Sequence, residues 1–484
     1  MGYIAAIASK RGEDISHLLL RMLKTQSSRV DGVGIASREG AIAQPWMPEE
    51  TPRGDMVIGC LYTKITPLDH PQPITQYGYH IAMEGRLWSG RCDILEMAER
   101  LGHNPHQGLR RLIEEGEGSY IVVILDEGHI LCGRDPVGLA PLYIGESESL
   151  IAAASNRRML WSLGLKAKPL KPGHIARISP KSLEVERVRV LEQPKAEAMS
   201  MREAVERLDE AMRSSVERRV KGLRRVCLAF SGGLDSSVIA RYLDLAGVDV
   251  ELLSVGLEGS KDLEAAAEAA EQLDLPIRAE SYRMGDVEEA LDEVLWSVEE
   301  ADPVKVSIAL PLYWCARLAV EEGVHTLFVG QGCDEIFGGY RRYLDLYASM
   351  GGEVRRQLFR DVAESYEVNY ARDYKVCMDQ GVEVRAPYTD LEVIELGLSI
   401  PIELKLSRDG GRKLILRRLA ETLGLPGSIA WRRKRAIQYS TGVSRALRRI
   451  GGRKLRDYLE RRLRKLLSLS PEGYMGDFYG GVQA

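Results

Sequence analysis

The residue types best suited to chemistry form a short glycine-rich loop at residues 231–237, with the sequence SGGLDSS. The apolar run before it, residues 226–230, predicts a strand, and the residues after it have helical spacing. Two glycines permit a tight turn whose N–H groups point inward, and the N-terminus of the following helix favours negative charge. The serine hydroxyls add donors for phosphate oxygens. The loop therefore predicts a phosphate-binding site at a strand end.

A second glycine-rich loop has the sequence VGQGCDEIFGGY and covers residues 329–340. It also begins where an apolar run, residues 326–329, ends. Asp235 and Asp334 are then expected at the carboxyl ends of parallel strands, where ligands of open α/β sheets bind. Carboxylates are natural ligands for a hard divalent cation that bridges phosphates. We therefore predict that Asp235 and Asp334 hold Mg²⁺.

These two loops carry a family resemblance. The first resembles the SGGxDS signature of the PP-loop ATP pyrophosphatases, and no Walker GxxxxGK[ST] sequence occurs here. The second resembles the SGEGxDExFGGY block of asparagine synthetases. The resemblance implies that ATP is bound and that AMP, rather than the terminal phosphate, is transferred. The implied nucleotide contacts are Phe230, Ser231, Gly232, Gly233, Leu234, Asp235, Ser236, Ser237, Val255, Val329 and Gly330.

Three further blocks follow in the family's order. Residues 254–262 resemble FAVGLxGSxD, which places Val255 at the adenine site. Residues 381–390 resemble the GVEARVPFLD segment near the substrate pocket. Residues 430–434 resemble a block whose lysine contacts phosphate, so the resemblance makes Lys434 the candidate catalytic group that stabilises departing pyrophosphate.

One residue departs from the synthetase pattern. Gln331 stands where the SGEG block has its glutamate, which in the family is placed to manage protons of the incoming amine. A glutamine amide cannot accept a proton at neutral pH. We keep Gln331 as a candidate catalytic residue, with Glu335, Glu383 and Tyr388 as other candidate proton acceptors.

The first part of the chain resembles the N-terminal-nucleophile glutaminases. Residues 133–143, GRDPVGLAPLY, match their GRDxxGxxPLY segment, and residues 154–156 and 172–174 fall at their ASE and PxG signals. The resemblance implies that this fold is retained.

The glutaminase chemistry is not expected to be retained. These enzymes need an N-terminal Cys activated by its own amine, and Gly2 stands at that position. The arginine that grips glutamine aligns with Tyr62. The Asn of the oxyanion-hole Asn-Gly pair aligns with Glu84, whose charge would repel an oxyanion. We therefore expect no glutamine hydrolysis by the usual route.

The fold class follows from where strands and helices are expected. A chain of 484 residues is long enough for two domains. Residues 1–190 contain short apolar runs with a few helices, and the resemblance makes them an α+β glutaminase-like (Ntn) sandwich. Residues 200–450 alternate strands with helices, as in an α/β domain with a parallel sheet. Residues 451–484 are expected to form a basic C-terminal helix and tail.

Composition limits the partners. The net charge of −4 argues against wholesale nucleic-acid binding, and the seven scattered cysteines indicate neither a disulfide framework nor a zinc site. No apolar run is long enough to predict a membrane span. We expect a cytoplasmic protein, and the resemblance allows a homodimer. The basic stretch at residues 451–467 could bind an anionic partner, but its pattern favours a solvated amphipathic helix.

The expected reaction joins a small-molecule carboxylate to ammonia or an amine, with ATP and Mg²⁺. The family default is aspartate as the carboxylate. Two alternatives stay open. One is an amide ligase like the β-lactam synthetases, with a different carboxylate and amine. The other is a nucleotide-binding regulatory protein without turnover.

Overall fold

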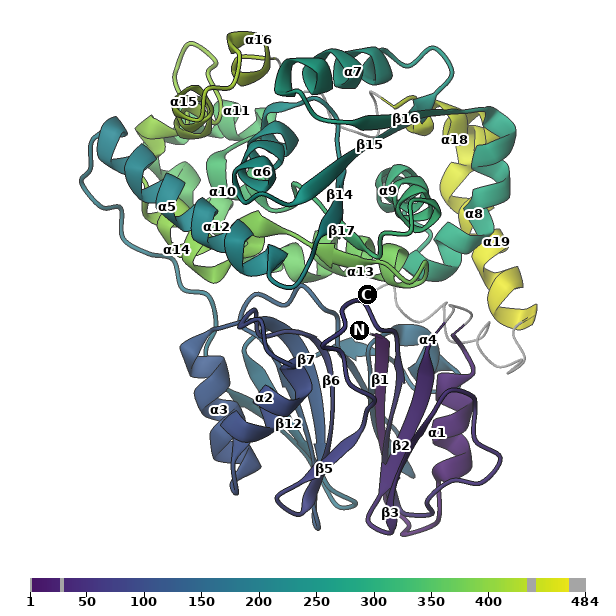
Figure 1. Cartoon of the computed structure of the whole chain (residues 1–484). Helices are drawn as coiled ribbons and strands as arrows, with labels where there is room; N and C mark the ends of the chain where they lie inside the picture. The colour runs from purple at the N-terminus through teal and green to yellow at the C-terminus, as the bar shows by residue number, and fades with distance from the viewer. Residues whose placement is uncertain (1, 27–29, 433–440, 470–484) are drawn as a thin grey trace.

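The computed structural model of the chain describes residues 2–26, 30–432 and 441–469. Its N-terminal part has two antiparallel sheets, and its C-terminal part is built on one parallel sheet (Figure 1). The predicted change from a β-rich part to an α/β part is confirmed. The exact domain boundaries stay a prediction.

The two antiparallel sheets pack face to face. Each buries nearly continuous apolar strands such as SYIVVIL in β7, because both of its faces are covered. The first sheet has the order β11 (Lys168–Pro169), β9 (Tyr143–Glu146), β10 (Leu150–Ala154), β1 (Gly2–Ser9), β4 (Met56–Tyr62), β2 (Gly32–Ser37) and β3 (Gly40–Gln44). The second has the order β13 (Leu183–Arg187), β12 (His174–Ile178), β8 (Ile130–Arg134), β7 (Ser119–Leu125), β6 (Tyr79–Arg86) and β5 (Ile74–Gln76).

Helices cover the outer faces of this sandwich. α1 (Ser16–Leu23) and α4 (Arg157–Trp161) pack on the first sheet, and α2 (Asp93–Leu101) and α3 (Pro105–Glu115) pack on the second. Figure 1 shows α2 and α3 on one side of the sandwich and α1 on the other. The result is a four-layer arrangement of helix, sheet, sheet and helix.

The parallel sheet carries the two glycine-rich loops. Its order is β16 (Ile277–Tyr282), β15 (Asp249–Leu257), β14 (Arg225–Ala229), β17 (Thr326–Phe328) and β18 (Glu383–Arg385). β14 and β17 are neighbours, with Cys227 opposite Leu327. The loops that follow these two strands therefore leave the same edge of the sheet side by side.

Helices lie on both faces of this sheet, with α6 and α9 on opposite sides of β14 and β15 (Figure 1). The helices are α5 (Met201–Val220), α6 (Leu234–Leu245), α7 (Lys261–Leu273), α8 (Met284–Val298), α9 (Pro303–Glu321), α10 (Cys333–Phe337), α11 (Arg341–Met350), α12 (Val354–Ser365), α13 (Ala371–Met378), α14 (Leu391–Ser399), α15 (Leu414–Thr422), α16 (Gly427–Ala430), α18 (Val443–Gly451) and α19 (Leu455–Leu469). Single turns η1 (Gly351–Glu353), η3 (Pro387–Thr389), η4 (Ile402–Leu404) and η5 (Gly452–Lys454) and the π-helical η2 (Tyr366–Tyr370) connect some of them.

Helix α9 corrects one expectation. By length and composition it is apolar enough to cross a membrane, although the sequence predicted no such run, and 67% of its most apolar window is buried inside the protein. Asp302 caps the helix by accepting hydrogen bonds from the N–H groups of Val304 and Lys305 at 2.8 and 2.9 Å, and Pro303 occupies its first turn. The apolarity of α9 reflects its place in the core.

The two parts are joined by a continuous hydrophobic core and by buried ion pairs. Arg86 of β6 donates from Nη2 to Glu383 of β18 at 2.7 Å, and Arg385 donates from Nε to the same carboxylate at 2.7 Å. Burial alone would raise the pKa of Glu383, but Arg385 and Arg86 hold it at about 2. The N-terminal part is therefore docked through charges that are buried.

Candidate active site

The first glycine-rich loop leads into a helix whose start is not capped by a side chain of the N-cap residue. The loop leaves β14 at Phe230 and enters α6, whose N-cap, Gly233, provides no side-chain hydrogen bond. The loop's own contacts are long: Gly233 N–H donates to Ser231 Oγ at 3.4 Å. Ser237 Oγ is buried and has no hydrogen-bond partner in the described part of the chain. The first turn of a 12-residue helix is thus uncapped, as an anion-binding N-terminus requires.

The loop's shape depends on Gly232. Its φ of +64° lies in the left-handed region, and a Cβ there would meet the carbonyl oxygen of Ala265 at 2.6 Å. Arg432, 200 residues further along the chain, fixes the same turn. Its Nη1 donates to the carbonyls of Gly232 at 3.1 Å and Ala265 at 2.8 Å. The loop is held in place before any ligand binds.

The two predicted acids converge on one lysine. Lys413 Nζ lies 2.6 Å from both carboxylate oxygens of Asp235 and 2.5 Å from Oδ1 of Asp334. Lys413 is buried, which by itself would lower its pKa, but the neighbouring Asp235 carboxylate raises it. A permanently charged ammonium therefore sits between the two loops.

The donor set fits Mg²⁺ bound together with phosphate. Mg²⁺ is commonly held by one or two carboxylates, with substrate phosphates and water completing its shell. Asp235 and Asp334 supply two carboxylates that flank the same space. Among the described residues, no group of three or more His, Cys, Asp or Glu side chains is arranged to hold a metal ion. The protein alone would thus bind the ion incompletely, and ligand phosphates would complete its coordination.

Lys413 is the site residue that the sequence did not reveal. It stands at the N-cap of α15 with a φ of +55°, which is uncommon for a lysine. It is 178 residues from Asp235 along the chain. The nearby Gly410 and Gly411 signal a turn, but nothing in the sequence shows where the turn lies.

The other predicted nucleotide contacts surround the strand ends. Phe230, Val255 and Val329 are buried at the carboxyl ends of β14, β15 and β17. A Cβ on Gly330 would lie 3.5 Å from the Cβ of Asp235, so the two loops touch. Whether these residues contact a nucleotide stays a prediction.

Lys434 lies outside the described residues. The residues on either side of the undescribed segment both contact the site. Arg432 bonds the first loop, and the Thr441 carbonyl accepts a hydrogen bond from the N–H of Leu257 at 2.9 Å, at the end of β15. Arg432 and Thr441 therefore both lie at this edge of the sheet.

Gln331 is half-buried at the start of the second loop. Of the other candidate proton acceptors, Glu383 is committed to the ion pair between the two parts, and the Tyr388 hydroxyl donates to the Asp235 carbonyl at 3.1 Å. Glu335 is buried, and its Oε1 accepts hydrogen bonds from Tyr340 at 2.5 Å and Asn369 at 3.0 Å. Burial raises the pKa of Glu335.

Position 2 in the N-terminal part has no room for a side chain. Gly2 pairs with Tyr62 across β1 and β4, and a Cβ added to it would overlap the backbone carbonyl of Leu61. A cysteine nucleophile there would require β4 to move. A side chain at position 2 is therefore excluded by the packing of the sheet as well as absent from the sequence.

The other two altered positions are also filled. Tyr62 is buried, with its hydroxyl occupying the space that a side chain at Gly32 would need. Glu84 is buried, and its Oε2 accepts a hydrogen bond from Ser155 Oγ at 2.7 Å. Burial raises the pKa of Glu84 to about 7, against the lowering effect of its hydrogen bonds.

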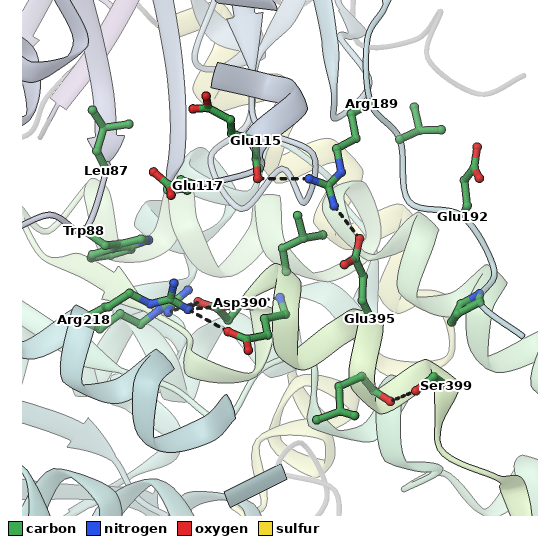
Figure 2. A pocket seen from close by; sticks show the side chains of 18 of the residues that line it. Leu87, Trp88, Glu115, Glu117, Arg189, Glu192, Arg218, Asp390, Glu395 and Ser399 are labelled. Atoms are coloured by element: carbon green, nitrogen blue, oxygen red, sulfur yellow. Dashed lines mark hydrogen bonds and ion pairs between the residues drawn. The ribbon is translucent and has the colours of Figure 1, made fainter. Parts of the chain in front are cut away.

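A cavity of about 1070 Å³ lies away from both loops, between the two parts of the chain. Figure 2 shows Arg189 reaching Glu395 and the backbone at Glu115, and Arg218 facing Asp390. The cavity is lined by none of the residues of the two loops. Most of its basic and acidic side chains form ion pairs with each other. We therefore assign the candidate active site to the strand ends.

Comparisons with known proteins identify the family of the chain. The family model described as asparagine synthase matches residues 207–353 and 348–475. The chain is 32% identical over 413 residues to an asparagine synthetase [glutamine-hydrolyzing] 1 of Methanocaldococcus jannaschii, covering 74% of this chain and 76% of that protein. It is 27% identical to a Dictyostelium discoideum asparagine synthetase [glutamine-hydrolyzing], covering 68% of this chain and 63% of that one.

Solved structures resemble this chain less than these relatives do. A Bacillus subtilis glutamine phosphoribosylpyrophosphate amidotransferase is 15% identical with a TM-score of 0.34, covering 57% of this chain and 65% of that one. This likeness is too low to support an argument. The family match and the Methanocaldococcus relative are sufficient by themselves: the chain belongs to the asparagine synthase family of ATP-dependent carbon–nitrogen ligases.

Proposed function

We propose that this protein adenylates a carboxylate with ATP, releases pyrophosphate, and forms an amide when ammonia or an amine attacks the acyl-adenylate. The convergence of Asp235, Asp334 and Lys413 beside the uncapped start of α6 carries this proposal. It is an arrangement for holding a polyphosphate and the cation that accompanies it.

The residues of the site have distinct tasks in this reaction. N–H groups at the start of α6 and the hydroxyl of Ser237 would bind phosphate oxygens of the substrate ATP. Asp235 and Asp334 would hold Mg²⁺, which neutralises charge on the phosphates when bound. The Lys413 ammonium offsets the negative charge of the two carboxylates. Lys434 is our candidate for stabilising the departing pyrophosphate.

The nitrogen would come from free ammonia or an amine rather than from glutamine. Support comes from the N-terminal part, which we propose to be a glutaminase-like fold without its nucleophile. Gly2 has no side chain and no space for one, and Glu84 fills the predicted oxyanion position. The printed names of two relatives include glutamine hydrolysis, and our proposal for this chain departs from those names on this point.

The default carboxylate is aspartate, but Gln331 favours a second candidate. A ligase that uses another carboxylate and amine, as in the β-lactam synthetases that the chain resembles, would need no glutamate at this position. The buried Glu335, whose pKa is raised, is the neighbouring carboxyl that could take up a proton.

The direct experiment incubates the purified protein with ATP, Mg²⁺, aspartate and either ammonium or glutamine. Release of asparagine and AMP with ammonium alone is expected for the default reaction. Equal product from glutamine would disprove the loss of the glutaminase. AMP release with a different acid, and none with aspartate, would select the second candidate.

We also propose a cytoplasmic location, because all seven cysteines are free thiols. A homodimer stays a prediction.

A further inference from the structure

The strongest charge asymmetry of the chain lies on its last two helices. Residues 443–469 carry ten basic and two acidic side chains, so the rest of the chain has 56 of the 66 basic and 68 of the 70 acidic residues. Figure 1 shows α18 and α19 together along one edge of the C-terminal part, next to α8. A cationic surface is thus attached to an otherwise anionic protein.

The apolar sides of both helices are fixed against the protein. Leu447 of α18 and Leu459, Leu463 and Leu467 of α19 are fully buried, and the helices pack on α8 and α9. Six exposed residues lie on the outward sides, and we call them the basic face: Arg445, Arg448, Arg449, Arg461, Arg464 and Lys465. Because the buried leucines hold the helices, the basic face cannot turn inward.

The charges of the basic face have little local compensation. Asp457 lies four residues before Arg461 and Glu460 four residues before Arg464, but no acidic residue lies three or four positions from the other four members of the basic face. Its members form no ion pair with any acidic side chain in the part of the chain that the structure describes. Elsewhere in the protein, exposed arginines at helical spacing have acidic partners, such as Arg110 with Glu114 at 2.9 Å and Arg202 with Glu206 at 2.8 Å.

Like charges repel each other across the basic face. Arg445 is three and four residues from Arg448 and Arg449, and Arg461 is three and four residues from Arg464 and Lys465. Pairs at these spacings are neighbours on a helix, so like charges there destabilise it. An anionic partner would relieve this repulsion. If the basic face were only solvated, the repulsion would destabilise the helices without any benefit to the protein.

The chemistry of the surface selects a protein rather than a nucleic acid. Tyr458 is the only aromatic residue in residues 443–469, and its hydroxyl accepts a hydrogen bond from Arg462 at 2.7 Å, so the surface offers little for base stacking. The acidic remainder of the chain would repel a polyanion that extends beyond these helices. Guanidinium groups match carboxylates with paired hydrogen bonds.

We propose that the basic face docks an acidic, Asp/Glu-rich segment of another protein. α18 begins next to Gly442, which packs against Leu257 at the carboxyl end of β15. A docked segment would therefore have one end near the proposed active site. The sequence alone favoured a solvated helix, but the unpaired and mutually repelling arginines favour the partner.

The test compares the full chain with two charge-matched variants. One carries Arg448→Gln, Arg449→Gln, Arg464→Gln and Lys465→Gln, and the control carries Arg91→Gln, Arg110→Gln, Arg202→Gln and Arg418→Gln. The probes are a fluorescein-labelled oligoglutamate peptide of about 16 residues, comparable in length to α19, and a single-stranded RNA of equal charge. Fluorescence anisotropy at 50 and 150 mM salt gives the affinities.

We expect the unaltered protein and the control to bind the peptide more tightly than the RNA. The basic-face variant should lose at least ~10-fold in peptide affinity. Its pyrophosphate–ATP exchange should be unchanged. Equal peptide binding by both variants, or RNA binding as tight as peptide binding, would overturn the proposal. If the Gln variant folds poorly, Arg448→Lys, Arg449→Lys and Arg464→Lys should retain the peptide affinity.

Discussion

Lys413 lies 2.6 Å from Asp235, although the two residues are 178 positions apart and only one of them was visible as a site residue in the sequence. The pair places an ammonium group beside the two carboxylates that we propose to bind Mg²⁺. The ammonium offsets the negative charge of the Asp235 and Asp334 carboxylates. Mg²⁺ would offset the charge of these carboxylates and of the bound polyphosphate. We propose that Mg²⁺ enters this site together with the phosphates of ATP.

This balance predicts the effect of Lys413→Met. Without the ammonium, Asp235 and Asp334 repel each other, so the variant should be less stable in EDTA, and Mg²⁺ should raise its Tm by several degrees more than that of the unaltered protein. Differential scanning fluorimetry measures this. Lys168→Met, at an exposed lysine of β11, should respond like the unaltered protein. An identical Mg²⁺ response in all three would contradict a shared role of Lys413 and Mg²⁺.

Filling position 2 should not restore a glutaminase. Gly2→Cys places a Cβ against the Leu61 carbonyl, so we expect about 2 kcal/mol of destabilisation and no glutamine hydrolysis. Urea unfolding and a glutamate-release assay measure the two effects. Gly128→Cys is the control, because a Cβ there meets nothing within 4 Å. Glutaminase activity in Gly2→Cys would show that β4 can move and that the fold retains the chemistry.

Glu84 should make stability depend on pH. Its folded pKa of about 7 exceeds the ordinary value of 4.5, so the folded state binds the extra proton between these values. The contribution of Glu84 to the free energy of unfolding is therefore fully present below pH 4.5 and is lost as the pH rises through 7. Glu84→Gln should be nearly neutral at pH 4 and more stable than the unaltered protein at pH 8 by about 3 kcal/mol. If the free energies of unfolding of the two proteins, measured in urea, changed in parallel with pH, the raised pKa of Glu84 would be contradicted.

The ion pair between the two parts should matter more than an exposed one. Glu383→Gln leaves the buried Arg86 and Arg385 without their carboxylate and should cost about 3 kcal/mol. Glu395→Gln removes the half-exposed partner of Arg189 and should cost less than about 1 kcal/mol. Both variants replace a carboxylate by an amide, so chemical denaturation compares a buried carboxylate that contacts two arginines with a half-exposed one that contacts one. Equal costs would mean that Glu383 does not hold the parts together.

The sequence was most informative where chemistry and local structure coincide. The SGGLDSS loop requires a strand, a turn with Gly232 at positive φ and a helix start, and all three are visible in neighbouring residues. The alternation of strands and helices likewise predicted the parallel sheet. Such features depend on contacts close in sequence.

Contacts that are distant in sequence could not be predicted in the same way. Lys413 reaches Asp235 only through the packing of α15, and Arg86 meets Glu383 across 297 residues. The sequence did not predict an apolar helix as long as α9, and only the structure shows that most of this helix is buried between a sheet and its neighbours. Position 2 shows the same limit, since the sequence revealed the missing cysteine but not the missing space.

Pyrophosphate–ATP exchange across a panel of carboxylates tests the central claim most directly. Radiolabelled pyrophosphate should enter ATP only when Mg²⁺ and an accepted carboxylate, aspartate first among them, are both present. Asp235→Asn should reduce this exchange by at least ~100-fold. ATP binding with no exchange for any carboxylate would contradict the account and leave a nucleotide-binding protein without turnover.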